Sequence, residues 1–298
     1  MLLRGTKALE EAFSSRRALA GLVAYNLETV QGIVQAAETT RRPVILQAGS
    51  SAFRHAGLRQ LAMLALEAAH ASRVPIGVHL DHSRSLEEIS ACLELGYSSV
   101  MANGSHLSFA DNVTFTREAV ERAHAAGAWA EAELVAIAGD EELSTGTVAG
   151  AMTDPNQASE FVHDTGVDAL AVAVGNVHGF TAVIPTIDLQ RLEALRDATG
   201  IPLVLHGASG LLNSVLLDCL DRGVAKVNVN AELRRAFLAA LEDRLPAVSE
   251  TGDLASALDA GRQAVAVSAE AIIRTLARAE TRQVPSGPVP SGGLTRGE

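Results

Sequence analysis

Three histidines stand at positions of the 298-residue sequence where a metal ion could be held. His82, His178 and His206 end or follow apolar runs, in the contexts HLDH, GNVHG and LHGASG. Neutral imidazoles suit zinc, and three protein ligands leave one coordination position open for a substrate. A single histidine at such a place is more often a hydrogen-bonded strand-end residue. Three in matching contexts instead favour a catalytic zinc site.

Carboxylates lie close to these histidines in the sequence. Asp81 directly precedes His82, so we expect it to donate or accept a proton on a metal-bound substrate. The alternative is a carboxylate that only orients a histidine. Glu133 ends another apolar run and could support a ligand or hold a second cation. His79 alternates with Asp81 along one run and could as easily be a packed, hydrogen-bonded barrel residue, so we leave it out of the metal ligands.

The elements around these residues must bring them to one rim. Short runs rich in Val, Ile, Leu and Ala recur, each followed by a segment of helical period, which predicts parallel strands covered by helices. Eight such units favour a (β/α)8 TIM barrel, an α/β fold, over an open sheet. The expected strands span residues 19–26, 44–48, 75–80, 98–102, 128–134, 169–174, 202–205 and 225–229. The active site of such a barrel lies at the carboxyl ends of its strands, where the histidines are predicted to meet.

Two segments fall outside the regular strand–helix pattern. Residues 133–155 are too many for an ordinary strand–helix connection, and we expect a mobile loop over the site that carries Glu141. The barrel domain is predicted to occupy residues 1–280, with a C-terminal helical extension over 254–278. Residues 281–298, rich in Pro, Ser and Gly, are expected to be a disordered tail.

Composition narrows the functional classes. The chain has 35 acidic and 24 basic residues, a formal charge of -11, and no basic cluster suited to nucleic acid. Its start lacks a secretory signal, and no apolar run reaches the roughly 20 residues of a membrane span. Cys92 and Cys219 show no metal or redox spacing and are predicted to be buried thiols. We expect a cytoplasmic enzyme with a small-molecule substrate.

With these residues in hand, the chain resembles the class II, zinc-dependent fructose-bisphosphate and tagatose-bisphosphate aldolases. The motifs that carry the likeness, in order over about residues 5–280, are HLDH (79–82), NGSH (103–106), EAEL (131–134), GNVHG (175–179), VLHGASG (204–210) and KVNVNAEL (226–233). The resemblance implies one zinc ion per subunit on His82, His178 and His206, and allows an additional monovalent cation. It also implies that Asp81 shuttles the proton of the hydroxyl at the cleaved bond. Glu141 would exchange a carbon-bound proton of the ketone donor.

The same resemblance implies where a sugar phosphate binds and how the chain assembles. Arg262 resembles an arginine that reaches a second phosphate, in some members across a subunit contact, and a homodimer or homotetramer is expected. The positions that match donor-phosphate contacts are Gly179, Gly207, Ser209, Asn228 and Asn230.

Several positions depart from the family pattern. Leu22 and Val23 stand where a Phe-Asn pair is usual, and Ala231 replaces a threonine that contacts phosphate. Asn103 replaces an aspartate associated with metal positioning, and no basic residue follows His178 closely. The departures therefore spare the zinc and proton groups and fall mostly on substrate contacts. We expect a donor or acceptor other than the usual ketose bisphosphate.

Two alternatives to an aldolase stay open on the sequence. One is a binding or regulatory barrel descended from this family, which retention of Asp81 and Glu141 argues against. The other is a metal-dependent sugar isomerase or epimerase, which needs a second carboxylate across the metal. Glu133 could supply that carboxylate.

Overall fold

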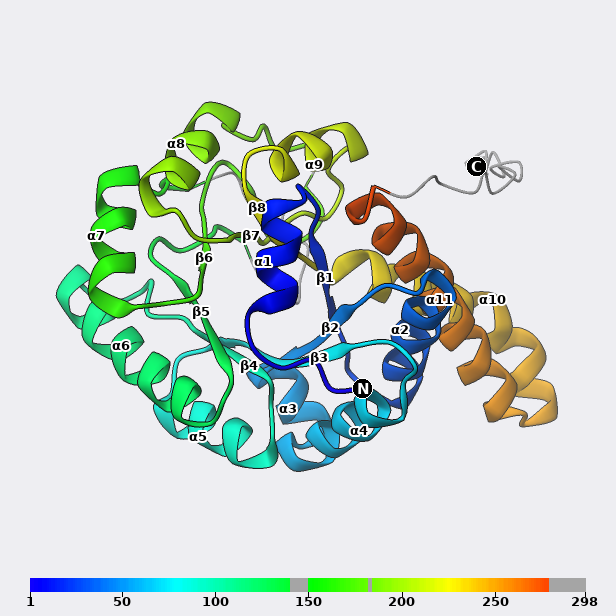
Figure 1. The fold of residues 1–298 in the computed structure, drawn as a ribbon. Helices are drawn as coiled ribbons and strands as arrows, with labels where there is room; N and C mark the ends of the chain where they lie inside the picture. Colours follow the sequence, from blue (N-terminus) through cyan, green and yellow to red (C-terminus); the bar gives the residue numbers. More distant parts are fainter. Residues whose placement is uncertain (140–149, 182–183, 279–298) are drawn as a thin grey trace, which may run out of the picture.

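Eight parallel strands close into a barrel in chain order, each paired with the next and β8 with β1 (Figure 1). The computed structural model describes residues 1–139, 150–181 and 184–278. The predicted (β/α)8 barrel is confirmed, although β1 and β6 end earlier than predicted. The strands are β1 (Leu19–Val23), β2 (Val44–Gly49), β3 (Ile76–Ser83), β4 (Ser99–Ala102), β5 (Trp129–Glu133), β6 (Ala169–Ala171), β7 (Leu203–Leu205) and β8 (Val224–Val229).

Helices form the outer layer of the barrel, and one helix lies across its amino-terminal end (Figure 1). At the C-terminus α11 packs against α2, and α10 packs against α11. Helix α11 spans the predicted C-terminal helix almost residue for residue. The helices are α1 (Lys7–Ser14), α2 (Leu27–Thr40), α3 (Ser50–Ala56), α4 (Leu58–Ala71), α5 (Leu86–Leu95), α6 (Phe109–Ala125), α7 (Pro155–Thr165), α8 (Leu189–Thr199), α9 (Asn213–Leu220), α10 (Ala231–Thr251) and α11 (Leu254–Leu276).

The local sequence explains where several helices begin. Asn26 caps α2 in a reciprocal arrangement with Thr29, Ser85 accepts a hydrogen bond from the Glu88 amide at the start of α5, and Asp154 caps α7 ahead of Pro155. Each cap satisfies backbone N–H groups that a helix start leaves free, typically worth about 1 kcal/mol.

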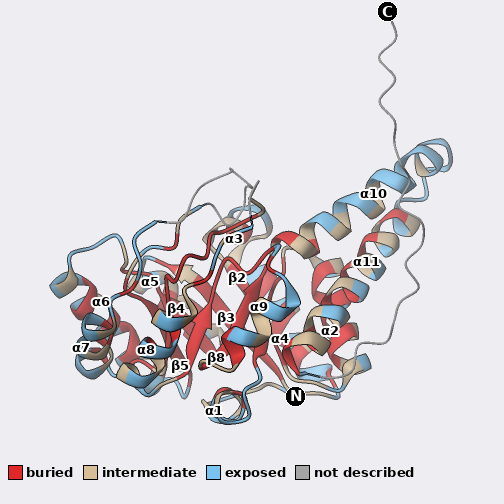
Figure 2. Cartoon of the chain, turned by 90° about the horizontal axis from the view of Figure 1, so that it is seen from above, coloured by how far each residue is buried: buried red, intermediate tan, exposed pale blue. Residues whose placement is uncertain are grey.

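The strands are buried along almost their whole length, as expected for a sheet covered on one face by helices and filled on the other (Figure 2). A large apolar cluster lies between the strands and the outer helices. A second, smaller cluster fills the amino-terminal half of the barrel interior, where Leu9 and Ala12 of α1 meet Ile45, Met101 and Trp129. The carboxyl-terminal half of the interior is left to polar side chains.

Candidate active site

The three histidines predicted to bind a metal come together at the carboxyl-terminal rim of the barrel. One ring nitrogen from each of His82, His178 and His206 lies within 4.8 Å of the other two. His82 is the second-last residue of β3, and His206 directly follows β7. Among the described residues, these three histidines are the group of potential ligand side chains close enough together to hold a metal ion.

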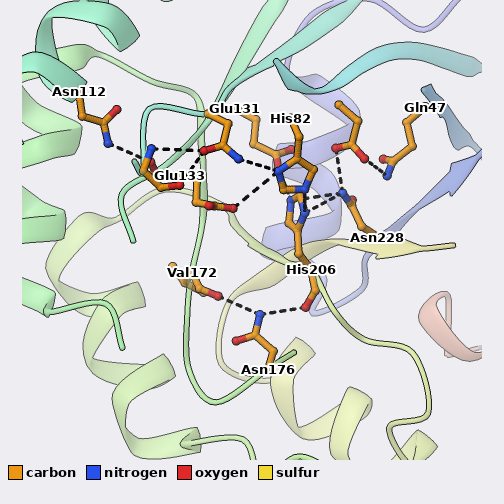
Figure 3. Close-up of polar contacts among 12 residues, drawn as sticks. Gln47, His82, Asn112, Glu131, Glu133, Val172, Asn176, His206 and Asn228 are labelled. Carbon is orange, nitrogen blue, oxygen red and sulfur yellow. Dashed lines mark hydrogen bonds and ion pairs between the residues drawn. The ribbon is translucent and has the colours of Figure 1, made fainter. Parts of the chain in front are cut away.

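His178 does not end a strand, as the sequence suggested, because β6 stops at Ala171. The intervening loop is held by its own side chain: Asn176 donates to the backbone oxygens of Val172 and His206, at 3.2 and 2.9 Å (Figure 3). The His178 amide donates to the Ala138 carbonyl at 2.9 Å. These hydrogen bonds fix an irregular segment at the rim.

A register shift lets Asp81 and His82 serve the same cavity although they are neighbours. The β3–β4 pairing slips between Leu80 and Ser83, and His82 has a left-handed backbone with φ of 49°. Successive side chains of a regular strand point to opposite faces. The bulge and the positive φ, which histidine tolerates better than most residues, bring both side chains to one cavity.

A buried ion pair supports His206. Its Nε2 lies 2.7 Å from Glu131 Oε1, and Glu131 Oε2 accepts from Lys226 Nζ at 2.7 Å, with all three side chains fully buried. Burial alone would raise the pKa of Glu131, but Lys226 and then His206 outweigh it, and the pKa lies well below the usual range. The carboxylate therefore holds a proton on Nε2 and leaves Nδ1 facing His82.

His79 packs inside the barrel. Its ring stacks on Trp129, its Nδ1 lies 2.8 Å from the Ser99 hydroxyl, and its side chain is fully buried. Burial, and then the charge of Lys226, hold the pKa of His79 well below its ordinary value. The imidazole is thus neutral and structural.

Asn103 and Glu133 both face His82. The Asn103 Nδ2 lies 2.9 Å from His82 Nδ1, and the Asn103 Oδ1 accepts from the Ser105 hydroxyl at 2.7 Å. Glu133 Oε2 is 3.9 Å from the same His82 nitrogen and has no hydrogen-bond partner among the described residues, although it is buried. A buried carboxylate oxygen without a donor is costly, so it fits a site completed by a cation.

Two side-chain amides hold the Asp81 carboxylate. Oδ2 accepts from Gln47 Nε2 at 2.9 Å, and Oδ1 accepts from Asn228 Nδ2 at 3.3 Å (Figure 3). Gly21 makes room for this arrangement, because a Cβ at that position would meet both the Gln47 Oε1 and the Asn228 Oδ1. Asp81 as a whole residue is 2% exposed, and it lies at the edge of a cavity.

The cavity has a volume of about 370 Å³, which suits a small metabolite. The Asp81, His82, Asn103, Glu133 and His178 side chains line it. So do Ala136, Ile137 and Gly139, the described start of the long segment that follows β5. Glu141 itself lies outside the described residues.

A second, small cavity of about 20 Å³ lies beside the first, roughly the size of one water molecule. Its walls include all five residues matched to the donor phosphate, Gly179, Gly207, Ser209, Asn228 and Asn230, together with Val23 and Ala231. Gly207 has φ of 59°, and a Cβ there would collide with the Val177 carbonyl. This backbone therefore needs glycine.

Ser209 is engaged differently from the expectation. Its hydroxyl donates to Glu232 Oε2 at 2.7 Å, and the Gly210 amide donates to Glu232 Oε1 at 2.9 Å. That hydroxyl proton is already used, so an anion in this cavity would depend mainly on backbone amides.

Arg262 is not brought to the cavity by its own chain. It lies on α11, pairs with Asp259 at 2.9 Å and donates to the Gln35 side chain of α2 at 2.7 Å. It borders a separate groove lined mainly by α2, the end of α4 and the segment after α4.

Several site residues were missed from the sequence. Gln47, Glu131 and Lys226 each interrupt an apolar strand, and a polar residue at an inward position of such a strand was the available signal. Arg54 and Arg84 also line the cavity, on α3 and just after β3. Cys92 and Cys219 are buried and unpaired, as predicted.

A closed (β/α)8 barrel with clustered histidines, a buried aspartate and a cavity at its carboxyl-terminal rim has the anatomy of a barrel enzyme. The chain belongs to the family described as fructose-bisphosphate aldolase class-II, whose model matches residues 4–281. It is therefore an aldolase, of a family that is generally metal-dependent and acts on small molecules.

Solved structures agree with this assignment. The YdjI aldolase from Escherichia coli K12 is 31% identical, with a TM-score of 0.79 over 93% of this chain and 97% of that one. A candidate fructose-1,6-biphosphate aldolase from Coccidioides immitis is 33% identical, with a TM-score of 0.83 over 92% and 96%. The fructose-bisphosphate aldolase of Campylobacter jejuni, at 18% identity and a TM-score of 0.79 over 92% and 94%, shares the fold.

Within the described ranges, no helix combines the length and the apolar character that crossing a bilayer requires.

Proposed function

We propose that the protein is a zinc-dependent aldolase that reversibly cleaves a ketose phosphate or bisphosphate. The observation that carries the proposal is the cluster of His82, His178 and His206 at the barrel rim. His82 and His178 line the adjoining cavity, with Asp81 on the same wall. The enzyme would act as a homodimer or homotetramer, by its family likeness.

The residues present fit a zinc ion. Three imidazoles suit zinc and leave a position for substrate, Glu131 orients His206, and Glu133 offers a buried oxygen without a donor beside His82. When bound, zinc would act as a Lewis acid on the ketone oxygen of the donor half. An additional monovalent cation is compatible with this site.

Asp81 would handle the proton of the reacting hydroxyl. In cleavage, the bond between carbons 3 and 4 of the ketose breaks, the carbon 4 hydroxyl gives its proton to Asp81, and carbon 4 becomes the aldehyde. The electron pair of the broken bond passes into the donor half, and a proton added at carbon 3 completes the ketone product. Gln47 and Asn228 hold the Asp81 carboxylate ready for this transfer. Glu141 is our candidate for the carbon 3 proton.

The donor phosphate would sit against the small cavity. Val23 and Ala231, which replace an amide and a hydroxyl of the family pattern, both line it. The altered contacts therefore gather at one end of the substrate. One lost charge-assisted hydrogen bond is worth roughly 1.5 to 3 kcal/mol, enough to change which donor is preferred.

One observation favours a second candidate, a metal-dependent epimerase. Glu133 faces the same cavity as Asp81, and a pair of carboxylates could remove and return a carbon-bound proton. Because the chain belongs to an aldolase family, we place the epimerase after the aldolase as a candidate function.

The test compares metal-free and zinc-restored protein on fructose 1,6-bisphosphate and tagatose 1,6-bisphosphate. We expect cleavage only with zinc bound at one ion per subunit. Asp81→Asn should lower kcat by about 100-fold to 10,000-fold while zinc content stays unchanged. Loss of zinc from Asp81→Asn would contradict a proton-transfer role, and an epimer without aldehyde would favour the second candidate.

A further inference from the structure

Two arginines lie on the opposite side of the barrel rim from the small cavity whose walls include the residues matched to the donor phosphate. Arg54 lies on α3, which follows β2, and Arg84 follows β3. Gly179 and Gly207 follow β6 and β7, the strands diametrically opposite in an eight-strand barrel. Both arginines line the 370 Å³ cavity and neither lines the small one. The two ends of the site thus differ in chemistry.

A shared carboxylate fixes the segments that carry these arginines. Glu88 Oε2 accepts from the Ser50 hydroxyl at 3.0 Å and from the Ser83 hydroxyl at 2.6 Å. Ser50 begins the helix of Arg54, and Ser83 directly precedes Arg84. The β2–α3 and β3–α5 connections are therefore tied together at the cavity wall.

The guanidinium groups themselves are not used by the fold. Within residues 1–139, 150–181 and 184–278, neither Arg54 nor Arg84 has an ion pair or a side-chain hydrogen bond, and both are exposed. Arg122, Arg191, Arg196, Arg274 and Arg278, by contrast, each pair with a carboxylate. Two unpaired arginines at the wall of a substrate cavity have donors available for an incoming anion.

We propose that Arg54 and Arg84 form a subsite for an anionic group at the aldehyde end of the substrate, supplied by the same subunit that holds the histidines. A carboxylate and a phosphate share the required chemistry, because both accept paired N–H donors from guanidinium. The inference rests on the proposed aldolase function. It also differs from the expectation for Arg262, which its own chain keeps between α2 and α11.

The test is aldol condensation of dihydroxyacetone phosphate with three acceptors of similar size on the zinc-loaded protein. Glyceraldehyde is neutral, glyceraldehyde 3-phosphate carries a phosphate, and tartronate semialdehyde carries a carboxylate. Arg54→Gln, Arg84→Gln and the double variant are compared with Arg59→Gln, which removes the same charge from an exposed position on α4. Thermal unfolding checks that each variant is folded.

We expect at least one anionic acceptor to have a KM about 10-fold or more below that of glyceraldehyde. The double variant should erase that advantage, while Arg59→Gln should preserve it. The preferred acceptor would identify the anion as phosphate or carboxylate. Added salt should raise the KM for the anionic acceptor, because the arginines are exposed.

Equal use of neutral and anionic acceptors, unchanged in the double variant, would overturn the subsite and leave the aldolase assignment intact. Zinc-loaded protein that condenses none of the three acceptors and cleaves neither bisphosphate would remove the proposed function and the subsite together. Calorimetric titration with 3-phosphoglycerate and glycerate gives a second readout. Binding that is the same in wild type and the double variant would also count against the subsite.

Discussion

Lys226 and Glu131 face each other across the barrel interior, with 2.7 Å between Nζ and Oε2 and no exposure of either side chain. They come from β8 and β5, which are not neighbours in the sheet. The β7–β8 pairing shifts register between Leu203 and Val204, opposite this part of β8. Glu131 in turn contacts His206, so the pair connects the barrel interior to the histidine cluster.

Lys226→Met should destabilise the protein and weaken metal binding. Removing one partner of a buried pair leaves an uncompensated charge, at a cost of about 3 to 5 kcal/mol. Loss of such support typically lowers metal affinity by about 10-fold to 100-fold. Urea unfolding and zinc competition with a chelator measure the two effects. Lys226→Met combined with Glu131→Gln removes both charges and should recover much of the stability; equal stability of single and double variants would contradict the account.

Gly21→Ala should impair catalysis more than folding. The added Cβ would meet the Gln47 Oε1 and, at 2.7 Å, the Asn228 Oδ1, and so displace the amides that hold Asp81. Overpacking of this kind costs about 1 to 3 kcal/mol, and we expect kcat to fall by about 10-fold or more.

Gly77→Ala is the matched control for this change. Its added Cβ would meet the apolar Ile45 at 3.3 Å on another strand of the same barrel. Steady-state kinetics and urea unfolding on both variants separate the effects. A Gly21→Ala protein with the kcat of Gly77→Ala would show that the Asp81 amides are not displaced.

The buried His79 should make folding less favourable in mild acid. Burial, then Lys226, hold the folded pKa well below 6.5, so the unfolded chain binds a proton that the folded protein excludes. Stability from this residue is therefore complete above the unfolded pKa and declines as pH falls below about 6.5, by at most about 1.4 kcal/mol per pH unit.

Urea unfolding at several pH values, compared with a His79→Phe, Ser99→Ala double variant, isolates this residue. The double variant keeps an aromatic ring beside Trp129 and removes both the titrating group and its hydroxyl partner. Its stability should depend less on pH than that of the wild type between about pH 5 and 6.5. Identical slopes would mean that His79 is protonated in the fold.

The two thiols should be inert in the folded protein. Burial raises the pKa of Cys219 to about 12, with Asp218 adding to the effect, and raises the pKa of Cys92 as well. The thiolate is the reactive form, so a chromogenic disulfide reagent should label neither cysteine at neutral pH until denaturant is added. Rapid labelling of native protein would contradict this burial.

The sequence predicted most of the architecture because inward- and outward-facing strand residues are both apolar in a covered parallel sheet. Runs such as Val44–Gly49 are recognisable without any partner. His82 and His206 could be singled out because they stand at strand ends. The cysteines could be read as buried because they sit in apolar helical segments.

What escaped prediction depends on register and loop geometry. Asp81 and His82 share a cavity only because β3 bulges and His82 adopts a positive φ. The contact of Glu131 with Lys226 depends on two strands that are not neighbours placing these side chains at the same level of the barrel interior. Arg54 was missed because it lies on the short helix α3, which ends one residue before α4, and nothing in the local sequence indicates that this helix borders the cavity.

Helix α1 and the smaller apolar cluster close the amino-terminal end of the barrel. This closure bears on the kinetics of the reaction. With that end filled, the described cavity exchanges with solvent at the opposite rim, and both cleavage products would leave by the same route. The donor half of the substrate would lie against the small cavity, and the aldehyde half would lie nearer Arg54 and Arg84. Release would then be sequential, with the aldehyde departing first and the ketone phosphate competing with fresh substrate. Product-inhibition patterns would record that order.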